Sequence, residues 1–280
     1  MPPSYDSPDS GAGRRAVRGK PAVHFIIKRR REGTDMISIA ISRTAEEMGL
    51  AAARQAAEVM NRSIADQGHA RIILSTGKSQ FEFLKAFVKM EIDWSKVEVF
   101  HLDEYINMSE DHPASFKKYL KERFLRYVSV KQMHFVEGNG DIGKTLEQLT
   151  IEIRKSPIDL ALIGIGENAH IAFNDPPADF TTEEAFKVVH LDEVCREQQF
   201  KEGWFPNRED VPKTAISMTV PQIMRSKAII SCVPYLSKAN AVKRTMESVV
   251  SPHVPSTILK THDRFFMYLD EESASQIVSL

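Results

Sequence analysis

The sequence IDLALIGIGENAHIAFNDPP, residues 158–177, is the stretch that decides the fold. Its first six residues form a short apolar run between Pro157 and Gly164, which is typical of a central strand in a parallel sheet. Ligands of open α/β sheets bind beyond the carboxyl ends of such strands. At that end stand His170, which can transfer a proton near neutral pH, and Asp175, which can orient it. The alternative interpretation is an ordinary turn with an incidental histidine.

The composition predicts a single domain. The chain has 280 residues, and its 37 basic and 38 acidic residues leave a formal charge of -1. A balance of this kind gives no general basic field for nucleic acid or an anionic membrane. Cys195 and Cys232 lie outside any CxxC or Cys/His metal spacing, so we interpret them as reduced thiols of a cytoplasmic protein and predict no metal site. No apolar stretch reaches the ~20 residues of a membrane span.

Residues 1–34 differ in composition from the rest of the chain. Residues 1–34 begin with Pro, Ser, Gly and Asp and continue with a run of Arg and Lys, a composition that predicts a flexible basic arm preceding a domain at residues 35–280. Contact of this arm with RNA or a partner is an alternative to a solvated terminus. Because ordered patterning begins near Met36, we also consider Met36 as the natural start.

From Met36 onward, strand and helix patterns alternate, which favours an α/β fold with a parallel sheet covered on both faces. Thr44 and Glu47 form a capping-box pattern for a long helix that Gly68 ends. The expected strands are residues 37–41, 71–74, 97–100, 158–163, 187–190, 215–220, 228–232 and 265–269.

The strand at residues 71–74 leads into a turn rich in hydroxyl groups. This turn consists of Ser75, Thr76, Gly77, Lys78 and Ser79, and helical spacing follows it. Hydroxyls and backbone N–H groups at such a turn can hold a phosphate. The spacing is not that of a Walker A loop, and simple helix capping by Ser or Thr is the alternative.

Two further strand ends carry charged residues. Asp103 and Glu104 follow the strand at 97–100, and alternation along a strand turns them to different sides, so that one can face the crevice at the sheet end. A carboxylate there can act as a general base. Lys238 follows the strand at 228–232 at a helix start, where a lysine is unfavourable unless an anion binds beside it. Capping and solvated-surface roles are the alternatives.

Together these residues resemble the glucosamine-6-phosphate deaminases and, more widely, the deaminase and 6-phosphogluconolactonase group. The resemblance is collinear from Met36 to the end of the chain. The most specific motifs are the Asp-Glu-Tyr sequence at residues 103–105 and the His-Ile-Ala-Phe-Asn sequence at residues 170–174. The other matching segments are 75–79, 164–176, 237–239 and 254–262.

The resemblance implies a Rossmann-like three-layer α/β/α fold with a mostly parallel sheet in a single domain. It also implies an aldose–ketose isomerisation coupled to deamination, with neither a metal nor a redox cofactor. By analogy, His170 assists opening of the sugar ring, Asp103 removes the C2 proton, and Asn168 and Asp175 complete the catalytic group. The implied substrate and phosphate contacts are Ser75, Thr76, Gly77, Lys78, Ser79, Gly166, Ala169, Gln199 and Lys238.

The chain departs from the family pattern at three positions. Asn168 replaces an aspartate, and Asp175 replaces a glutamate. An asparagine oxygen accepts an imidazole N–H but does not stabilise imidazolium by charge. Gln199 replaces an arginine and so lacks a charge-assisted contact to phosphate, with Arg196 nearby as a substitute. Basic residues of an allosteric site are not evident.

The leading hypothesis is a deaminase of glucosamine 6-phosphate or of a close epimer such as galactosamine 6-phosphate. Tyr105 and residues 173–174 disfavour the first alternative, a 6-phosphogluconolactonase-type lactone hydrolase. The second alternative is a sugar-phosphate sensor without catalysis, which requires a DNA-binding module that residues 1–34 do not provide. The expected partner is a small phosphorylated amino sugar, with no nucleic acid and no membrane, and homo-oligomerisation is left open.

Overall fold

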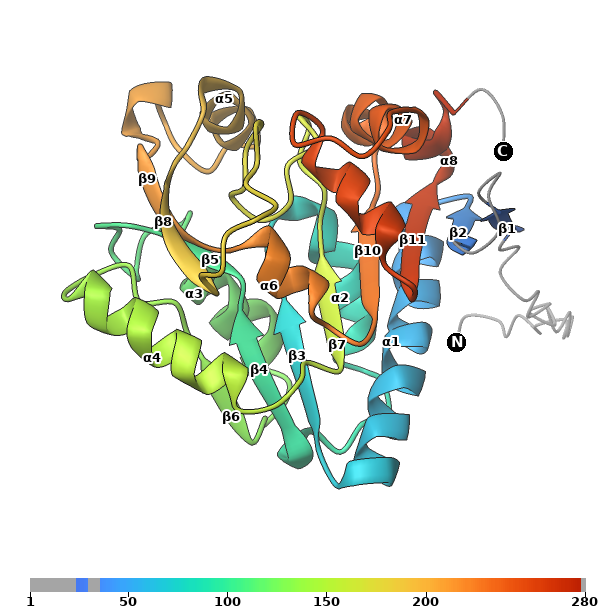
Figure 1. The fold of residues 1–280 in the computed structure, drawn as a ribbon, viewed down its shortest axis with the longest axis horizontal. Helices are drawn as coiled ribbons and strands as arrows, with labels where there is room; N and C mark the ends of the chain where they lie inside the picture. The colour runs from blue at the N-terminus through green and yellow to red at the C-terminus, as the bar shows by residue number, and fades with distance from the viewer. Residues whose placement is uncertain (1–23, 30–35, 278–280) are drawn as a thin grey trace, which may run out of the picture.

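The computed structural model describes residues 24–29 and 36–277, coloured along the chain in Figure 1. Within these ranges the strands are β1 (His24–Arg29), β2 (Met36–Ser42), β3 (Ala70–Leu74), β4 (Val97–His101), β5 (Asp103–Tyr105), β6 (Gln132–His134), β7 (Leu160–Ile163), β8 (Phe186–His190), β9 (Thr214–Met218), β10 (Ile229–Val233) and β11 (Phe265–Asp270). The helices are α1 (Ala45–Gln67), α2 (Phe81–Phe87), α3 (Phe116–Leu120), α4 (Ile142–Arg154), α5 (Glu193–Lys201), α6 (Val220–Met224), α7 (Ala239–Glu247) and α8 (Glu271–Ala274).

Eight of the described strands form one sheet in the order β1-β2-β11-β10-β7-β3-β4-β6. All neighbours pair in parallel except β1 and β2. From β3 the chain builds outward through β4 to β6, whereas from β7 it builds the other way through β10 to β11. The order therefore reverses between β3 and β7, and such a reversal leaves a crevice at the carboxyl ends of the two strands.

Strand β7 lies in the middle of this sheet and is buried along its whole length. Leu160 and Leu162 join the apolar cluster under α1 and α2, whereas Ala161 and Ile163 join the cluster under α4, α6 and α7. Successive side chains of a strand point to opposite faces, so an unbroken apolar run fits a strand covered on both sides. The prediction of a mostly parallel sheet between two helical layers is confirmed.

Helix α1 begins and ends where the sequence predicts. Thr44 accepts the backbone N–H of Glu47 at 3.2 Å, and Gly68 ends the helix with φ at 81°. The Glu47 carboxylate accepts the backbone N–H of Arg43 at 3.2 Å, so the reciprocal bond of the capping box goes one residue earlier than expected. Among the described residues, no helix combines the length and the apolar character that a membrane crossing requires.

Strands β5, β9 and β8 form a separate antiparallel sheet at the carboxyl end of the main sheet (Figure 1). The strands expected at residues 187–190 and 215–220 correspond to β8 and β9, and they belong to this small sheet and not to the parallel one. Their alternating pattern identifies a strand but not the sheet that it joins. Leu102 joins β4 to β5, and its carbonyl accepts the backbone N–H of Met218 at 2.9 Å, next to the pairing of β5 with β9.

One segment of residues 1–34, which the sequence predicts to be a flexible arm, is a strand in the structure. Residues 24–29 form β1, which pairs along its whole length with the edge strand β2. Ordered structure therefore begins before Met36. The rest of the predicted arm lies outside the described residues.

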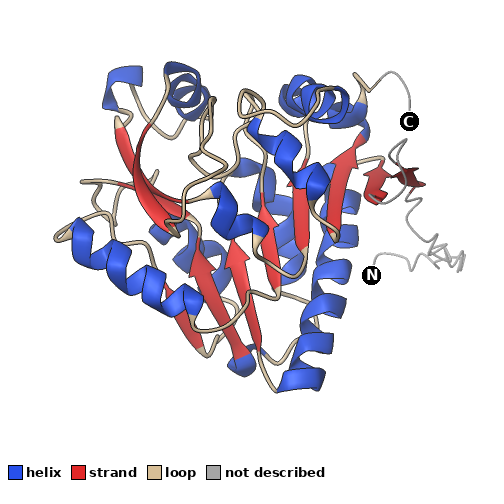
Figure 2. Ribbon diagram, in the orientation of Figure 1, coloured by secondary structure: helices blue, strands red, loops and turns tan. Residues whose placement is uncertain are grey.

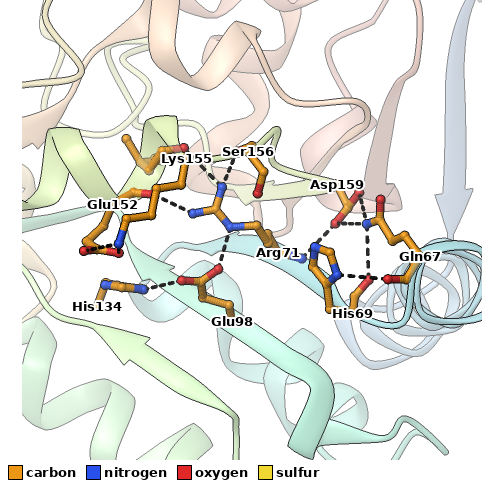
Figure 3. Close-up of polar contacts among 10 residues, drawn as sticks. Gln67, His69, Arg71, Glu98, His134, Glu152, Lys155, Ser156 and Asp159 are labelled. Atoms are coloured by element: carbon orange, nitrogen blue, oxygen red, sulfur yellow. Dashed lines mark hydrogen bonds and ion pairs between the residues drawn. The ribbon is translucent and has the colours of Figure 1, made fainter.

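A buried ionic cluster ties α4 to the amino ends of β3 and β4 (Figure 3). The Arg71 side chain is 2 % exposed and donates from Nε to Glu98 at 2.5 Å. Its terminal nitrogens donate to the carbonyls of Glu152 at 2.6 Å and Ile153 at 3.2 Å, at the end of α4. His134 lies 2.7 Å from the other oxygen of Glu98. A cation at a helix carboxyl end satisfies carbonyls that have no partner within the helix.

Candidate active site

A pocket opens at the carboxyl ends of β3, β4, β7 and β10, where the loops that follow the parallel strands gather (Figure 2). It lies at the reversal of strand order between β3 and β7. The lining residues come from six separate segments: Ser75, Thr76, Gly77, Lys78, Ser79, Leu102, Asp103, Phe116, Gly164, Ile165, Gly166, His170, Ala172, Phe173, Gln198, Gln199, Glu202 and Lys238.

The hydroxyl-rich turn after β3 lines the pocket, and two hydrogen bonds hold its backbone in place. The backbone N–H of Ser75 donates to the carbonyl of Leu162 at 3.0 Å, and the Tyr119 hydroxyl donates to the carbonyl of Gly77 at 2.9 Å. Gly77 has φ at 99°, a conformation that favours glycine. No side chain caps the next helical turn or α2, so simple helix capping does not explain these hydroxyls. The buried hydroxyl of Ser75 has no hydrogen-bond partner among the described residues and is available to a ligand.

Lys238 brings a buried cation to the same pocket. Its side chain is 5 % exposed, and none of the described carboxylates lies within ion-pair distance of it. Burial lowers the pKa of its ammonium, although Glu202 and Glu167 act in the opposite direction. A buried ammonium without a close counter-charge is costly, and a bound anion would remove that cost.

Asp103 and Glu104 face opposite ways, as alternation along the strand predicts. Asp103 lines the pocket and is 5 % exposed. Glu104 accepts the backbone N–H groups of Lys117 at 2.7 Å and Phe116 at 3.2 Å, and the hydroxyl of Ser115 at 3.2 Å, so it closes the start of α3. Burial, with a smaller contribution from the charge of Glu104, raises the pKa of Asp103 well above its ordinary range.

We expect Glu104→Gln to shift the acid limb of the pH–rate profile to lower pH. The charge of Glu104 disfavours ionisation of Asp103, so removing this charge lowers the pKa of Asp103. The measurement is kcat/KM as a function of pH, which reports groups of the free enzyme. Because Glu104 also supports the start of α3, thermal unfolding of the variant is the control for its stability. An acid limb that stays in place or moves to higher pH contradicts this expectation.

His170 lies against the backbone of Gly166 in a tight loop. The backbone N–H of Gly166 donates to the carbonyl of His170 at 2.9 Å. A side chain at position 166 would place its Cβ 2.2 Å from Nε2 of His170, so the imidazole occupies space that only glycine leaves free. The other ring nitrogen, Nδ1, lies 3.0 Å from Oδ1 of Asp175, within ion-pair distance but outside hydrogen-bond geometry. Asp175 thus places a negative charge beside Nδ1, and Nε2 remains for chemistry in the pocket.

Asn168 does not take the role that its sequence position suggests. Its oxygen accepts the backbone N–H of His170 at 3.0 Å, and its amide nitrogen donates to Asp175 at 3.0 Å and to Asp192 at 3.3 Å. The expectation that this oxygen could accept an imidazole N–H is wrong, because the ring faces Asp175. The negative charge beside His170 comes from Asp175, so the asparagine does not leave the ring without one.

The carboxylate of Asp175 stays ionised although it is largely buried. Burial by itself would raise its pKa, but His170, Asn168 and the backbone N–H of Asp192 outweigh burial and lower the pKa below its ordinary value. Cys195 completes a group with His170 and Asp175 whose potential ligand atoms all lie within 4.8 Å of one another. Burial and nearby carboxylates raise the pKa of this thiol well above its ordinary value.

The pocket brings together most of the residues expected to form the site. The exceptions are Asn168 and Asp175, which lie behind His170, and Ala169. Ala169 is fully buried with φ at 71°, and its carbonyl accepts the backbone N–H of Ser256 at 2.9 Å, so a substrate contact there stays a prediction.

Sequence reasoning missed Gln198 and Glu202, which stand beside Gln199 in the wall formed by α5 and the residue after it. Residues three and four apart share a helix face, and this spacing was the available signal. It also missed Phe116 and Phe173, whose rings stack 5.6 Å apart at the pocket wall. Their contact depends on tertiary structure, because they come from distant segments.

Comparison with known proteins agrees with this geometry. Residues 43–267 match the family described as glucosamine-6-phosphate isomerases/6-phosphogluconolactonase. A protein named glucosamine-6-phosphate deaminase from Streptococcus suis (strain 05ZYH33) is 34% identical over 207 residues, which cover 73% of this chain and 86% of that protein. A protein of the same name from Thermoanaerobacter sp. (strain X514) is 33% identical over 232 residues, covering 80% and 90%.

Solved structures show the same relationship. A monomeric glucosamine-6-phosphate deaminase superposes with a TM-score of 0.77 at 27% identity, covering 85% of this chain and 98% of the other. A 6-phosphogluconolactonase from Thermotoga maritima shares the fold, with a TM-score of 0.69 at 13% identity, covering 84% and 99%. The resemblance inferred from the sequence motifs is thereby confirmed, and the chain belongs to the family of glucosamine-6-phosphate isomerases and 6-phosphogluconolactonases.

Proposed function

We propose that this protein is an amino-sugar-phosphate deaminase, which converts glucosamine 6-phosphate or its galacto epimer to a ketose 6-phosphate and ammonia. One observation carries the proposal: Asp103 and His170 line a single pocket that also contains the hydroxyl turn and Lys238. A carboxylate, an oriented imidazole and an anion site are what ring opening and proton transfer on a sugar phosphate require.

In the first step His170 opens the sugar ring. It takes the proton of the C1 hydroxyl and returns a proton to the ring oxygen, so the C1–O5 bond breaks and an open-chain aldehyde forms. The short distance between Nδ1 and Asp175 supports this role, because the carboxylate favours a proton on Nδ1 and leaves Nε2 to exchange the proton.

In the second step Asp103 takes the C2 proton of the aldehyde. The electron pair moves toward C1 to give an enol-type intermediate, and reprotonation at C1 yields a ketose imine. Water then adds at C2 and the C–N bond breaks, so that one water is consumed and one ammonia is released. The raised pKa of Asp103 supports this role, since a more basic carboxylate suits proton removal from carbon.

The phosphate of the substrate fits the other end of the pocket. A phosphate group is complementary to three features there: the ammonium of Lys238, the hydroxyl of Ser75 that has no partner among the described residues, and the turn at Gly77. Gln199 lines the same pocket and offers an uncharged contact. We place the activity in the cytoplasm, since two buried free thiols suit a reducing compartment.

Three substrates test the proposal against its alternatives. The purified protein is incubated with glucosamine 6-phosphate, galactosamine 6-phosphate and 6-phosphogluconolactone, and ammonia, ketose phosphate and acid release are followed. We expect ammonia and ketose phosphate in equal amounts from at least one amino sugar. Acid release from the lactone alone would identify a lactonase, and binding without turnover of any substrate would identify a sensor.

We expect Lys238→Met to raise KM for the amino-sugar phosphate roughly 10- to 100-fold, with a much smaller effect on kcat. A hydrogen bond to a charged group contributes about 1.5–3 kcal/mol, and about 1.4 kcal/mol corresponds to a factor of ten. Methionine fills a similar buried volume without a charge, so the melting temperature should not fall. Steady-state kinetics check this expectation, and an unchanged KM removes Lys238 from the phosphate site.

A further inference from the structure

We propose that Asp192 is a positioning residue that holds Asp175 against His170 and couples this pair to the α5 wall of the pocket. The inference rests on the proposed function for its kinetic test. It concerns a residue that does not line the pocket and that the sequence motifs do not single out.

Asp192 contacts the catalytic loop through both its backbone and its side chain. Its backbone N–H donates to Oδ2 of Asp175 at 3.0 Å. Its Oδ2 accepts the amide of Asn168 at 3.3 Å. The same amide donates to Oδ1 of Asp175 at 3.0 Å, and that oxygen is the one 3.0 Å from Nδ1 of His170. Asp192 therefore fixes both oxygens of Asp175, one directly and one through Asn168.

The position of Asn168 explains why an amide stands between these carboxylates. Asp175 and Asp192 can only accept hydrogen bonds when ionised, so the residue between them has to donate. An aspartate at position 168 would place three carboxylates together with no side-chain donor between Asp175 and Asp192, and like charges at this distance repel. In this chain Asn168 supplies the hydrogen-bond donor, and the carboxylate of Asp192 supplies the negative charge that accepts this hydrogen bond.

Asp192 also begins α5, and this connects the pair to the pocket wall. Its Oδ1 accepts the backbone N–H of Cys195 at 2.6 Å, which caps the helix. Further along α5, Gln198 and Gln199 line the pocket. Gln198 makes a second link to the catalytic loop, because its Oε1 accepts the backbone N–H of Glu167 at 2.9 Å. A substrate that contacts α5 therefore acts on the orientation of His170 through Asp192 and Asp175.

The substitution Asp192→Asn separates positioning from capping. Asparagine caps a helix about as well as aspartate, so α5 keeps its start. With its oxygen on the cap, the new amide nitrogen faces the amide nitrogen of Asn168, and two donors cannot bond to each other. We expect kcat to fall roughly 10- to 100-fold, as misplacement of a reacting group does, with little change in KM.

The matched control is Asp141→Asn. Asp141 caps α4 through the backbone N–H of Lys144 at 3.0 Å and does not line the pocket. This control should leave kcat unchanged and should change the melting temperature about as much as Asp192→Asn does. If Asp192→Asn keeps kcat within about twofold of wild type, Asp192 is only a helix cap and the inference is overturned.

A double-mutant cycle with Asp175→Asn tests the route of the effect. If Asp192 acts through Asp175, the substitution at 192 costs much less kcat once Asp175 has been replaced. Fully additive losses would show that Asp192 acts on the rate by another route and would overturn the inference.

A measurement without substrate separates this inference from the proposed function. Nitrogen-15 NMR of the labelled imidazoles reports which nitrogen of His170 carries the proton, with His170→Gln to assign the signal. We expect the Nδ1-protonated form in wild type and a mixture of tautomers in Asp192→Asn. An unchanged tautomer overturns the inference even if ammonia is released, whereas absence of ammonia from wild type overturns only the proposed function.

Discussion

Replacing Asp103 with asparagine is expected to lower kcat for ammonia release roughly 100- to 10,000-fold, the range that general base catalysis contributes. Asparagine has nearly the same shape but cannot accept the C2 proton. Asp103 is the pocket carboxylate whose burial and neighbour Glu104 make it more basic than an ordinary aspartate. Steady-state ammonia release measures the effect. Activity within a few-fold of wild type would mean that another group is the base.

The same variant should still bind the substrate, because the phosphate end of the pocket is untouched. Equilibrium binding of glucosamine 6-phosphate to Asp103→Asn should lie within a few-fold of the wild-type KM. Lys238→Met is the matched comparison, since it should weaken binding and largely spare the chemical step. A loss of binding in Asp103→Asn as large as in Lys238→Met contradicts the separation of these two roles.

Asp103→Asn should also stabilise the fold at pH 8. Burial raises the folded-state pKa of Asp103 above its ordinary value of 3.8, so the folded state favours the protonated acid. Stability is therefore lost as the pH rises from the unfolded pKa through the folded pKa, and it is regained in acid. Asparagine does not ionise, so Asp103→Asn removes this loss of stability at higher pH. Each kcal/mol gained raises the melting temperature by about 2–4 °C for a chain of this size. The gain should be larger at pH 8 than near pH 4, and equal gains contradict this account.

The second large effect is expected from Gly166→Ala, which should lower kcat roughly 100-fold or more. An added Cβ would lie 2.2 Å from Nε2 and 2.3 Å from Cε1 of His170, distances that the ring can relieve only by moving. The backbone of Gly166 is not in the left-handed region, so the effect is steric and acts on His170 directly. Steady-state kinetics measure the loss, and a crystal structure of the variant should show the ring displaced from Asp175.

Gly164→Ala is the matched control for this substitution. It lies two residues earlier in the same loop, and its added Cβ would lie 3.1 Å from Nε2 of Gln80 and 3.5 Å from Oγ of Ser79. Both neighbours are side-chain ends that can give way, so kcat should fall much less than in Gly166→Ala. Equal losses in the two variants would indicate that the loop tolerates no added atom and that the position of His170 is not the cause.

Much of the fold was readable from local patterns. The apolar run before Gly164 indicated a strand buried on both faces, and Thr44 with Gly68 marked the ends of α1, because these features depend on neighbours in the chain. The pattern at residues 187–190 and 215–220 also identified strands. It could not assign them to the small antiparallel sheet, because pairing partners are chosen by contacts distant in sequence.

The candidate site, like the fold, has features that the sequence predicted and features that it could not predict. The sequence by itself determined which residue types stand at the carboxyl ends of the strands, and a parallel sheet brings those ends together: Ser75, Asp103, His170 and Lys238 line one pocket. Only the tertiary structure decided what stands behind His170. Asp175 faces the ring, and Asn168 donates to Asp175 and Asp192. The direction in which an asparagine donates depends on the acceptors that the folded chain places around it, and here these are two carboxylates, 7 and 24 residues further along the chain.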